Sequence, residues 1–204
     1  MKKNFTSFFA RCRTGIAAIL VTAMTLVPAL PAHAEEGTPP SLKELFAKEN
    51  MTVGFAAPNK VYSNEGKKQL ALYHFNSLTC ENECKPDALL DETTSKSDLS
   101  VYNESPAVNF EKNFEPALEF CKENGLKMRG HTLVWHNQTP EWLFHEDYDT
   151  TKPLAGRELM LKRMENYIKT VLEYVQTNYP GIVYAWDVVN EAFFDSEEGS
   201  GKDG

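Results

Sequence analysis

The feature that most constrains the fold is a repeated alternation between short apolar stretches and longer amphipathic ones. The short stretches are rich in branched and aromatic residues and cover residues 52–56, 76–79, 127–135 and 182–189. Each of the intervals between them contains a helical pattern. Strands that are apolar on both faces and alternate with helices are typical of a parallel sheet covered by helices. An α/β fold is therefore predicted.

The helices are predicted from spacing and from their end signals. Ser41 followed by Glu44 forms a capping box, which predicts a short helix ending near Asn50, and a second helix is expected over 67–75. A third pattern over 110–124 places Phe114, Leu118 and Cys121 on one face and ends at Gly125. The longest helix has an apolar stripe formed by Leu161, Met164, Ile168, Val171, Leu172 and Val175. The segments 91–109 and 195–204 are predicted to be loops.

Residues 1–34 have the pattern of a secretory signal peptide. Its basic residues precede an apolar run over 16–30, and they are Lys2, Lys3, Arg11 and Arg13. Ala32-His33-Ala34 follows as a cleavage site, so we expect a mature chain from about Glu35 that is secreted to the medium or periplasm. The alternative is an uncleaved membrane anchor, but the apolar run is shorter than the roughly 20 residues that a bilayer span needs. Cys12 lies before the run, which disfavours a lipoprotein.

Charge and cysteine content narrow the range of partners. The net charge is −8 at pH 7, and residues 1–34 contain no acidic residue, so the mature chain is more acidic still. This charge argues against nucleic acid or an anionic membrane as a partner and suits a neutral substrate. Cys80, Cys84 and Cys121 are an odd number, so no disulfide framework is implied. Cys80 and Cys84 could bind zinc, but no second pair of ligands has a matching spacing, and neither a metal nor a cofactor is predicted.

Polar residues follow three of the predicted strands at the point where each strand ends. Glu81-Asn82-Glu83 follows 76–79, the segment 131–136 completes the third strand, and Asn190-Glu191 follows 182–189. In parallel α/β folds the ligand-binding residues lie at the carboxyl ends of the strands. Each cluster alone has a structural explanation, because a carboxylate can cap a helix and a tryptophan can belong to the core. Three clusters at one edge favour a shared site.

His131 and His136 are five residues apart, and this spacing argues against a metal site. Side chains alternate along a strand, and five residues on a helix turn through about 500°, so in either case the two imidazoles point away from one face. Imidazoles that form hydrogen bonds with a polyhydroxylated ligand, or that hold a carboxylate in place, fit better, and Trp135 offers a flat face on which a sugar ring can rest.

Three segments resemble the successive signatures of glycoside hydrolase family 10, the endo-beta-1,4-xylanases. They are HFNSLTCENECKP (74–86), RGHTLVWHNQTPEWL (129–143) and WDVVNEAF (186–193), and the resemblance extends over about residues 42–204. It implies a (β/α)8 TIM barrel, of which this chain holds about the first four β/α units. The domain would cover 35–204 and would be incomplete at its C-terminal side. A cis peptide bond between His131 and Thr132 is also implied.

The resemblance implies a role for each polar residue. Glu191 would be the general acid/base of a retaining endo-1,4-beta-xylanase, and Asn190 would bind the 2-hydroxyl of the sugar that is cleaved. The glycone side of the cleft would be lined by Glu81, Asn82, Lys85, His131 and Trp135, and His136 would lie close to the catalytic carboxylates. Cys84 departs from the family pattern, in which this position is commonly Met, so Cys80 and Cys84 are interpreted as packing variants. The partner would be xylan or a xylo-oligosaccharide, and the complete protein would be a monomer.

The second carboxylate of a retaining glycosidase is expected outside this chain. In the family the nucleophile is a Glu at the end of the seventh strand, and only Glu197 and Glu198 follow Glu191 here, in a Gly/Ser-rich acidic stretch interpreted as a solvated loop. We therefore expect an incomplete xylanase sequence. Two alternatives stay open: a short product that at most binds xylan and is inactive, and an enzyme of related barrel fold acting on a beta-1,4-glucan.

Overall fold

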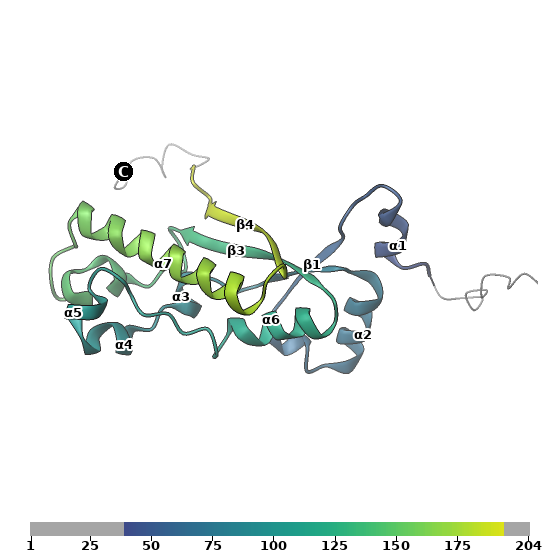
Figure 1. The fold of residues 1–204 in the computed structure, drawn as a ribbon, viewed down its shortest axis with the longest axis horizontal. Coiled ribbons are helices and arrows are strands. Elements are labelled where there is room, and N and C mark those ends of the chain that lie inside the picture. The colour runs from purple at the N-terminus through teal and green to yellow at the C-terminus, as the bar shows by residue number, and fades with distance from the viewer. Residues whose placement is uncertain (1–38, 194–204) are drawn as a thin grey trace, which may run out of the picture. The chain divides into compact units, whose positions relative to one another are not determined.

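The computed structural model describes residues 39–193, which form one parallel sheet with helices packed against it (Figure 1). The predicted signal segment 1–34 and the predicted loop 195–204 lie outside the described residues. The sheet has the strand order β1-β2-β3-β4, and each neighbouring pair is parallel. Its strands are β1 (Gly54–Ala57), β2 (Ser77–Cys80), β3 (Lys127–Trp135) and β4 (Val183–Asn190). The predicted parallel sheet is confirmed.

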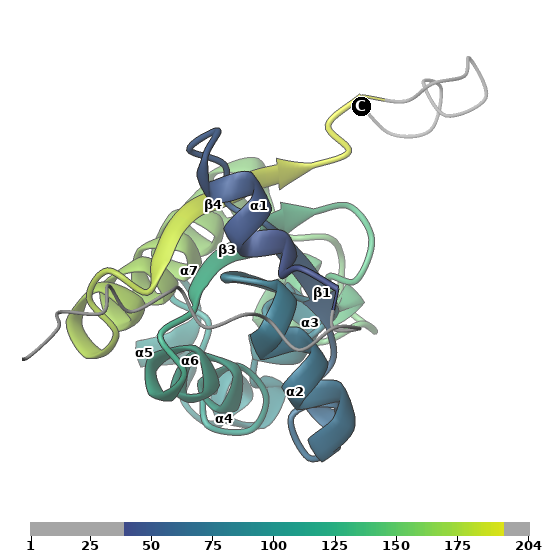
Figure 2. The same ribbon diagram turned by 90° about the vertical axis from the view of Figure 1, so that its right-hand side faces the viewer.

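The helices include all those that the sequence predicted and several short ones that it did not. The α-helices are α1 (Leu42–Ala47), α2 (Glu65–His74), α3 (Pro86–Leu89), α4 (Glu92–Ser97), α5 (Leu99–Tyr102), α6 (Phe114–Glu123) and α7 (Arg157–Asn178). Single 3-10 turns are formed by Asn59–Val61, Glu141–Phe144 and Glu146–Tyr148. Figures 1 and 2 show α6 and α7 beside each other along the sheet. The Tyr179 hydroxyl, just past α7, joins them by donating to Glu119 of α6 at 2.7 Å.

The core lies between the sheet and these two helices. Leu78 of β2 and Met128 of β3 are fully buried there against Phe114 of α6 and Val171 of α7. Because side chains alternate along a strand, the neighbours of Met128 on β3 project from the opposite face. Those neighbours include Arg129 and, two residues further, His131. The sheet thus has an apolar face covered by helices and a second face with polar side chains.

The predicted capping box at the first helix is wrong. Ser41 is the N-cap residue of α1, but its side chain makes no capping hydrogen bond. Its hydroxyl is buried and donates to the carbonyl oxygen of Tyr73 at 2.6 Å. A contact between distant segments has replaced the local one, and Ser41 fastens the start of α1 to the end of α2.

The prediction of a loop over 91–109 is also wrong, because α4 and α5 lie within it. Both helices begin at an aspartate that caps them. The Asp91 side chain accepts a hydrogen bond from the backbone amide of Thr94, and that of Asp98 accepts from Ser100. Aspartate at an N-cap satisfies an amide that would otherwise lack an intrahelical partner, and this stabilises even short polar helices.

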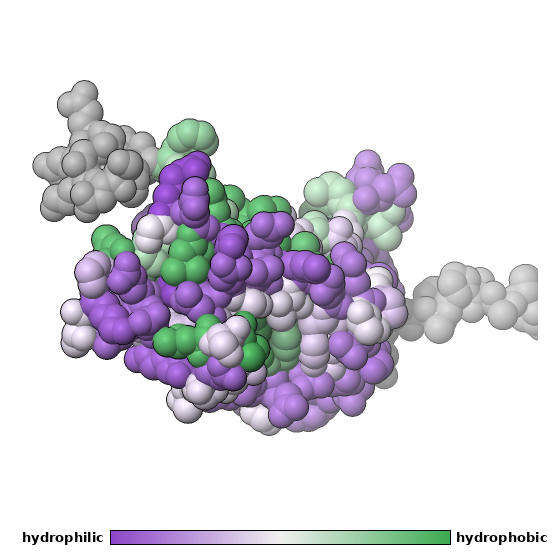
Figure 3. All heavy atoms as spheres, turned by 60° about the vertical axis from the view of Figure 1, so that its left-hand side comes forward, coloured by the Kyte–Doolittle hydropathy of each residue, from purple (hydrophilic) through white to green (hydrophobic). Residues whose placement is uncertain are grey.

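The apolar stripe of α7 is buried over only part of its length. Val171 and Val175 lie in the core, whereas Leu161 and Met164 are 42% and 40% exposed. These two side chains line a cavity of about 450 Å³ together with Val189 of β4. Figure 3 shows apolar patches on an otherwise hydrophilic face. Across the described residues, the exposed large apolar side chains include Leu154, Leu161, Met164, Val188, Val189 and Phe193.

A fully buried arginine fixes the loop that follows β3. Arg163 of α7 donates to the carbonyl oxygens of Leu143 at 2.6 Å and Asn103 at 2.8 Å. Its guanidinium also lies 4.0 Å from the centroid of the Tyr148 ring. Burial lowers the pKa of Arg163, because the charged form loses its hydration. Since four of its hydrogen bonds end on backbone or amide oxygens, this one side chain ties α7 to two loops that are distant in sequence.

Within the part of the chain that is described, no helix combines the length and the apolar character needed to cross a membrane.

The packing of β3 against β4 depends on Gly130, and this yields a first prediction. A Cβ atom at this position would lie 2.3 Å from the Trp186 ring of β4. Gly130→Ala should lower the free energy of unfolding by about 1–3 kcal/mol, because the indole must move out of a packed position. Urea denaturation measures the change.

Gly66→Ala is the matched control. This glycine lies in α2, and the nearest atom to an added Cβ is the Asn64 Oδ1 at 3.7 Å, an ordinary contact. Alanine favours the helix over glycine by up to about 1 kcal/mol, so this variant should be as stable as the parent or slightly more stable. Equal effects of the two substitutions would contradict the proposed packing role of Gly130.

Candidate active site

The carboxyl ends of β2, β3 and β4 bring together the residues that the sequence singled out. In the register of β3 and β4, Trp135 is paired with Asn190 and His131 with Asp187. Glu81, Asn82 and Lys85 belong to the turn that follows β2, the neighbour of β3 on its other side. The parallel register therefore places three segments that are far apart in the sequence at one edge of the sheet.

Lys85 is the centre of a hydrogen-bonded wall on the β2 side. Its side chain is only 7% exposed, and its ammonium group donates to the Asn82 Oδ1 at 3.0 Å and to the Gln138 Oε1 at 2.6 Å. The same nitrogen lies 5.0 Å from the centroid of the Trp135 ring, within cation–π range. Both hydrogen-bond acceptors are neutral amides, so neither of them compensates the charge of the Lys85 ammonium group.

Trp135 connects this wall to Glu191. Its indole Nε1 donates to the Glu191 Oε2 at 2.8 Å. The His136 Nε2 lies 3.9 Å from the same oxygen. Glu191 has a φ of 50°, in the left-handed region, where its backbone turns directly after the end of β4. Its side chain is 59% exposed, so the carboxylate, which accepts the Trp135 hydrogen bond, remains open to solvent in the described part of the chain.

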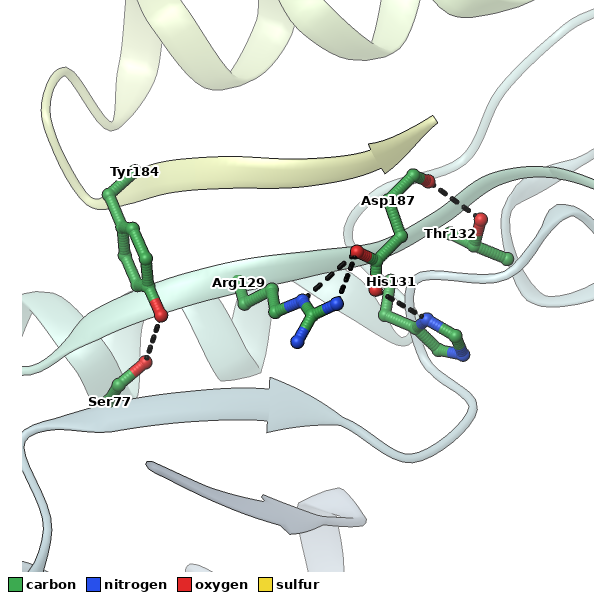
Figure 4. Close-up of polar contacts among 6 residues, drawn as sticks. All are labelled: Ser77, Arg129, His131, Thr132, Tyr184 and Asp187. Carbon is green, nitrogen blue, oxygen red and sulfur yellow. Dashed lines mark hydrogen bonds and ion pairs between the residues drawn. The ribbon is translucent and has the colours of Figure 1, made fainter. Parts of the chain in front are cut away.

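A second cluster lies on the polar face of the sheet and is centred on Asp187 (Figure 4). Arg129 donates to the Asp187 Oδ1 from Nε at 3.0 Å and from Nη2 at 2.7 Å. The His131 Nδ1 lies 2.9 Å from the other carboxylate oxygen. Partial burial by itself raises the pKa of Asp187, but the hydrogen bonds from Arg129 and His131 outweigh it, and the pKa lies below the usual range. Asp187 is therefore ionised at neutral pH.

Two cavities meet at the end of β4. The 450 Å³ cavity is mostly apolar and is bordered by Trp135, His136, Asn190 and Glu191. The other, of about 600 Å³, is more polar and is bordered by Glu81, His131, Asp187 and Asn190. Every predicted site residue except Asn82 and Lys85 borders one of the two; Lys85 lies over the ring of Trp135, which borders the first cavity, and Asn82 accepts a hydrogen bond from Lys85. Asn190 borders both.

Sequence reasoning missed three residues of the site, namely Arg129, Gln138 and Asp187. All three lie inside the quoted signature segments, so their proximity to the site could have been inferred. Their partners could not, because each contact crosses between strands or loops. The peptide bond between His131 and Thr132 is cis, as the resemblance implied.

Cys80, Cys84 and Cys121 have free thiols that are buried in the core. Burial raises the pKa of Cys84 to about 12, so this thiol is protonated at neutral pH. Their positions agree with the interpretation as packing residues. Among residues 39–193, no group of three potential ligand side chains is arranged to hold a metal ion.

Comparisons with known proteins show the family to which the chain belongs. Residues 41–203 match the family described as glycosyl hydrolase family 10. Endo-1,4-beta-xylanase B of Butyrivibrio fibrisolvens is 58% identical over 123 residues, which are 60% of this chain and 19% of that protein. Endo-1,4-beta-xylanase A of Thermotoga maritima is 42% identical over 153 residues, which are 75% of this chain and 13% of that protein. This chain thus spans only a small part of the length of these relatives.

A solved structure has the same fold over the part of the chain that it matches. The N-terminal endo-1,4-beta-D-xylanase 10B of Clostridium thermocellum, in complex with xylohexaose, superposes with a TM-score of 0.71 at 35% identity. The match covers 82% of this chain and 31% of that one. The predicted fold class is confirmed, because the four-stranded sheet corresponds to one part of a (β/α)8 barrel.

The depressed pKa of Asp187 predicts a pH-dependent stability. A carboxyl group whose pKa is lower in the folded protein than in the unfolded chain stabilises the fold above the unfolded pKa, near 3.9, and loses this contribution as the pH falls through the folded value. Asp187→Asn removes the contribution. The difference in unfolding free energy between the parent and this variant should be largest near neutral pH and should shrink below about pH 4.

Urea denaturation at a series of pH values measures this difference. Asp98, Glu119 and Asp149 also have lowered pKa values, so the parent will lose further stability in acid, and only the comparison with the variant isolates Asp187. A difference that stays constant down to about pH 3 would show that Asp187 is not stabilised in its ionised form.

Proposed function

Because the chain belongs to glycosyl hydrolase family 10, we propose that it forms part of the catalytic domain of an endo-1,4-beta-xylanase and carries its general acid/base, Glu191. The observation that carries the proposal is the position of Glu191. This carboxylate follows the end of β4, accepts a hydrogen bond from Trp135, and lies beside a wall of amide and ammonium groups. Such a wall suits an uncharged ligand with many hydroxyl groups.

The wall would bind the glycone side of the substrate. Lys85, Asn82 and Gln138 hold one another through hydrogen bonds, so their donors and acceptors have fixed directions before a sugar arrives. A preorganised polar surface loses little entropy when it binds a ligand. Asn190 borders both cavities, and this position supports the proposal that its amide binds the 2-hydroxyl of the sugar whose bond is cleaved.

Glu191 would transfer the proton. A general acid must reach the leaving oxygen of the glycosidic bond, and in a retaining enzyme the same group later removes a proton from water. Trp135 holds only the Oε2 atom of Glu191, and the high exposure of the side chain leaves the carboxyl group accessible to a substrate and to water. His136 lies near enough to stabilise the carboxylate form after proton transfer.

The nucleophile of the retaining mechanism would come from a part of the family domain that this chain does not span. A retaining enzyme needs two carboxyl groups about 5–5.5 Å apart. Among the described residues, the other carboxylates that border the two cavities are Glu81 and Asp187. The carboxylate of Asp187 is already held by Arg129 and His131, and the backbone of Asp187 lies four residues, about 13 Å of strand, before Glu191. The backbone of Glu81 follows a strand two spacings, about 10 Å, from the strand of Glu191. The 204-residue chain is therefore proposed to bind xylo-oligosaccharides without hydrolysing them.

A chimera tests the role of Glu191. Residues 41–193 would be joined to the part of the Butyrivibrio fibrisolvens catalytic domain that follows the matched region. Hydrolysis of xylan should appear in the chimera, and Glu191→Gln should lower its rate by about 100-fold or more, because the leaving oxygen then receives no proton. On an aryl xyloside whose leaving group needs no proton, the first step should be largely spared. The burst of phenol release before the steady state measures the first step on the aryl xyloside, because the later attack of water also needs Glu191 as a base, and the initial rate of reducing-sugar release measures the hydrolysis of xylan.

Glu141→Gln in the same chimera is the control. Glu141 lies in the loop after β3 with its side chain 82% exposed, and it should be dispensable. For Glu191→Gln, a loss in the phenol burst as large as the loss in xylan hydrolysis would exclude Glu191 as the acid. A beta-1,4-glucan assayed in parallel tests the other substrate class, and faster hydrolysis of glucan than of xylan would contradict the proposed specificity.

A further inference from the structure

Asp187 holds His131 in a way that determines which nitrogen of the imidazole faces a ligand. The two residues are direct partners in the register of β3 and β4, so their side chains leave the same face of the sheet. The His131 Nδ1 is 2.9 Å from the Asp187 Oδ2, and both side chains are about three-quarters buried, with 25% and 23% exposure. The other ring nitrogen, Nε2, is on the far side of the ring from Asp187, and His131 borders the 600 Å³ cavity.

The contacts of Arg129 determine which residue is the donor in the hydrogen bond between His131 and Asp187. It donates twice to the Oδ1 of Asp187, and the buried hydroxyl of Thr132 donates to the Asp187 backbone oxygen at 2.7 Å. The carboxylate is thereby fixed in position with a cation at one oxygen. An ionised carboxylate can only accept hydrogen bonds. The proton between the two residues must therefore belong to the Nδ1 of His131.

We propose that Asp187 is a positioning residue that fixes His131 in the Nδ1–H tautomer, so that the Nε2 atom accepts a hydrogen bond from a sugar hydroxyl. Neutral imidazole has one donor and one acceptor, and the partner of one nitrogen decides the role of the other. Among the described residues, the other charged or titratable groups that border the same cavity are Arg129 on β3, Cys80 on β2 and Glu81 after β2, and Tyr184 on β4 acts on Arg129. The part of the inference that concerns the sugar rests on the proposed function, whereas the tautomer does not.

The tautomer can be measured in the parent protein without any ligand. The 204-residue chain would be labelled with 15N-histidine and examined by two-bond 1H–15N NMR at a pH where the imidazole is neutral, with His131 assigned from the signal lost in His131→Gln. We expect Nδ1 to show the shift of a protonated nitrogen and Nε2 that of an unprotonated one. The opposite pattern in the parent would overturn the inference, whether or not any variant folds.

Asp187→Asn provides the specific change. With Arg129 still present, the amide oxygen of the new side chain should face the guanidinium and its NH₂ group should face the His131 Nδ1. An NH₂ group donates, so the imidazole should change to the Nε2–H tautomer, as Asp→Asn substitution does in the serine protease triad. Asp187→Ala removes the acceptor altogether and should also lose the Nδ1–H pattern. Asp149→Asn, which changes a partly exposed aspartate whose side chain accepts from Thr151, is the matched control and should leave His131 unchanged.

Binding of xylotriose by calorimetry gives the second readout. Asp187→Asn should weaken binding by about tenfold, the effect of one hydrogen bond changed from acceptor to donor, and Asp149→Asn should not. Persistence of the Nδ1–H tautomer in folded Asp187→Asn would overturn the positioning role. A parent that shows the expected tautomer but binds no xylotriose would support that role and overturn the proposed function instead.

Discussion

The parallel pairing of β3 with β4 is the constraint on which the rest of the site depends. Its register places Trp135 opposite Asn190 and His131 opposite Asp187. The first pair brings the indole of Trp135 within hydrogen-bonding distance of Glu191, and the second creates the contact between imidazole and carboxylate. A shift by one residue would turn each of these side chains to the other face of the sheet. Gly130 and Trp186 help to hold the register, because the indole fills the space where a Cβ would otherwise lie.

The two clusters of the site differ in whether the charge of the central residue is compensated by an opposite charge. Asp187 has Arg129 beside it, so its charge is compensated within the protein and its pKa is lowered. Lys85 is nearly as buried as the core residues, yet its hydrogen-bond partners in the described structure are neutral amide oxygens and its cationic head lies over an indole. A buried ammonium group without a carboxylate partner keeps its attraction for electronegative ligand atoms. We therefore propose that the charge-compensated cluster positions His131 and that the Lys85 wall binds the ligand.

Much of the fold followed from the sequence because each strand and long helix carries its own periodic signal. Phe114, Leu118 and Cys121, which the spacing placed on one face, are buried in α6, and Ala117 and Phe120 are buried beside them. The errors arose where a local signal competed with a distant contact or where a signal was overlooked. Ser41 forms a hydrogen bond with Tyr73 rather than capping α1, and the caps at Asp91 and Asp98 support helices in a segment that looked like a loop.

The candidate site, too, could be predicted only in part from the sequence. Residues at strand ends could be named from the sequence, since parallel strands place their carboxyl ends together. The partners of these residues could not, because the contacts of Lys85 with Gln138 and of Arg129 with Asp187 join segments more than 50 positions apart. Arg163 is the clearest case. A charged residue on an amphipathic helix is usually exposed, yet it is fully buried and holds the loops that follow β2 and β3.

The central claim is that the ends of β2, β3 and β4 form one carbohydrate-binding surface that ends at Glu191. A crystal structure of this chain with xylotriose tests it most directly. We expect sugar rings along the surface between Lys85 and Glu191, with hydroxyl groups hydrogen-bonded to Lys85 and Asn82 and a ring close to Trp135. Xylotriose bound at another face of the protein, or bound without contact to Lys85, Trp135 and Glu191, would contradict it.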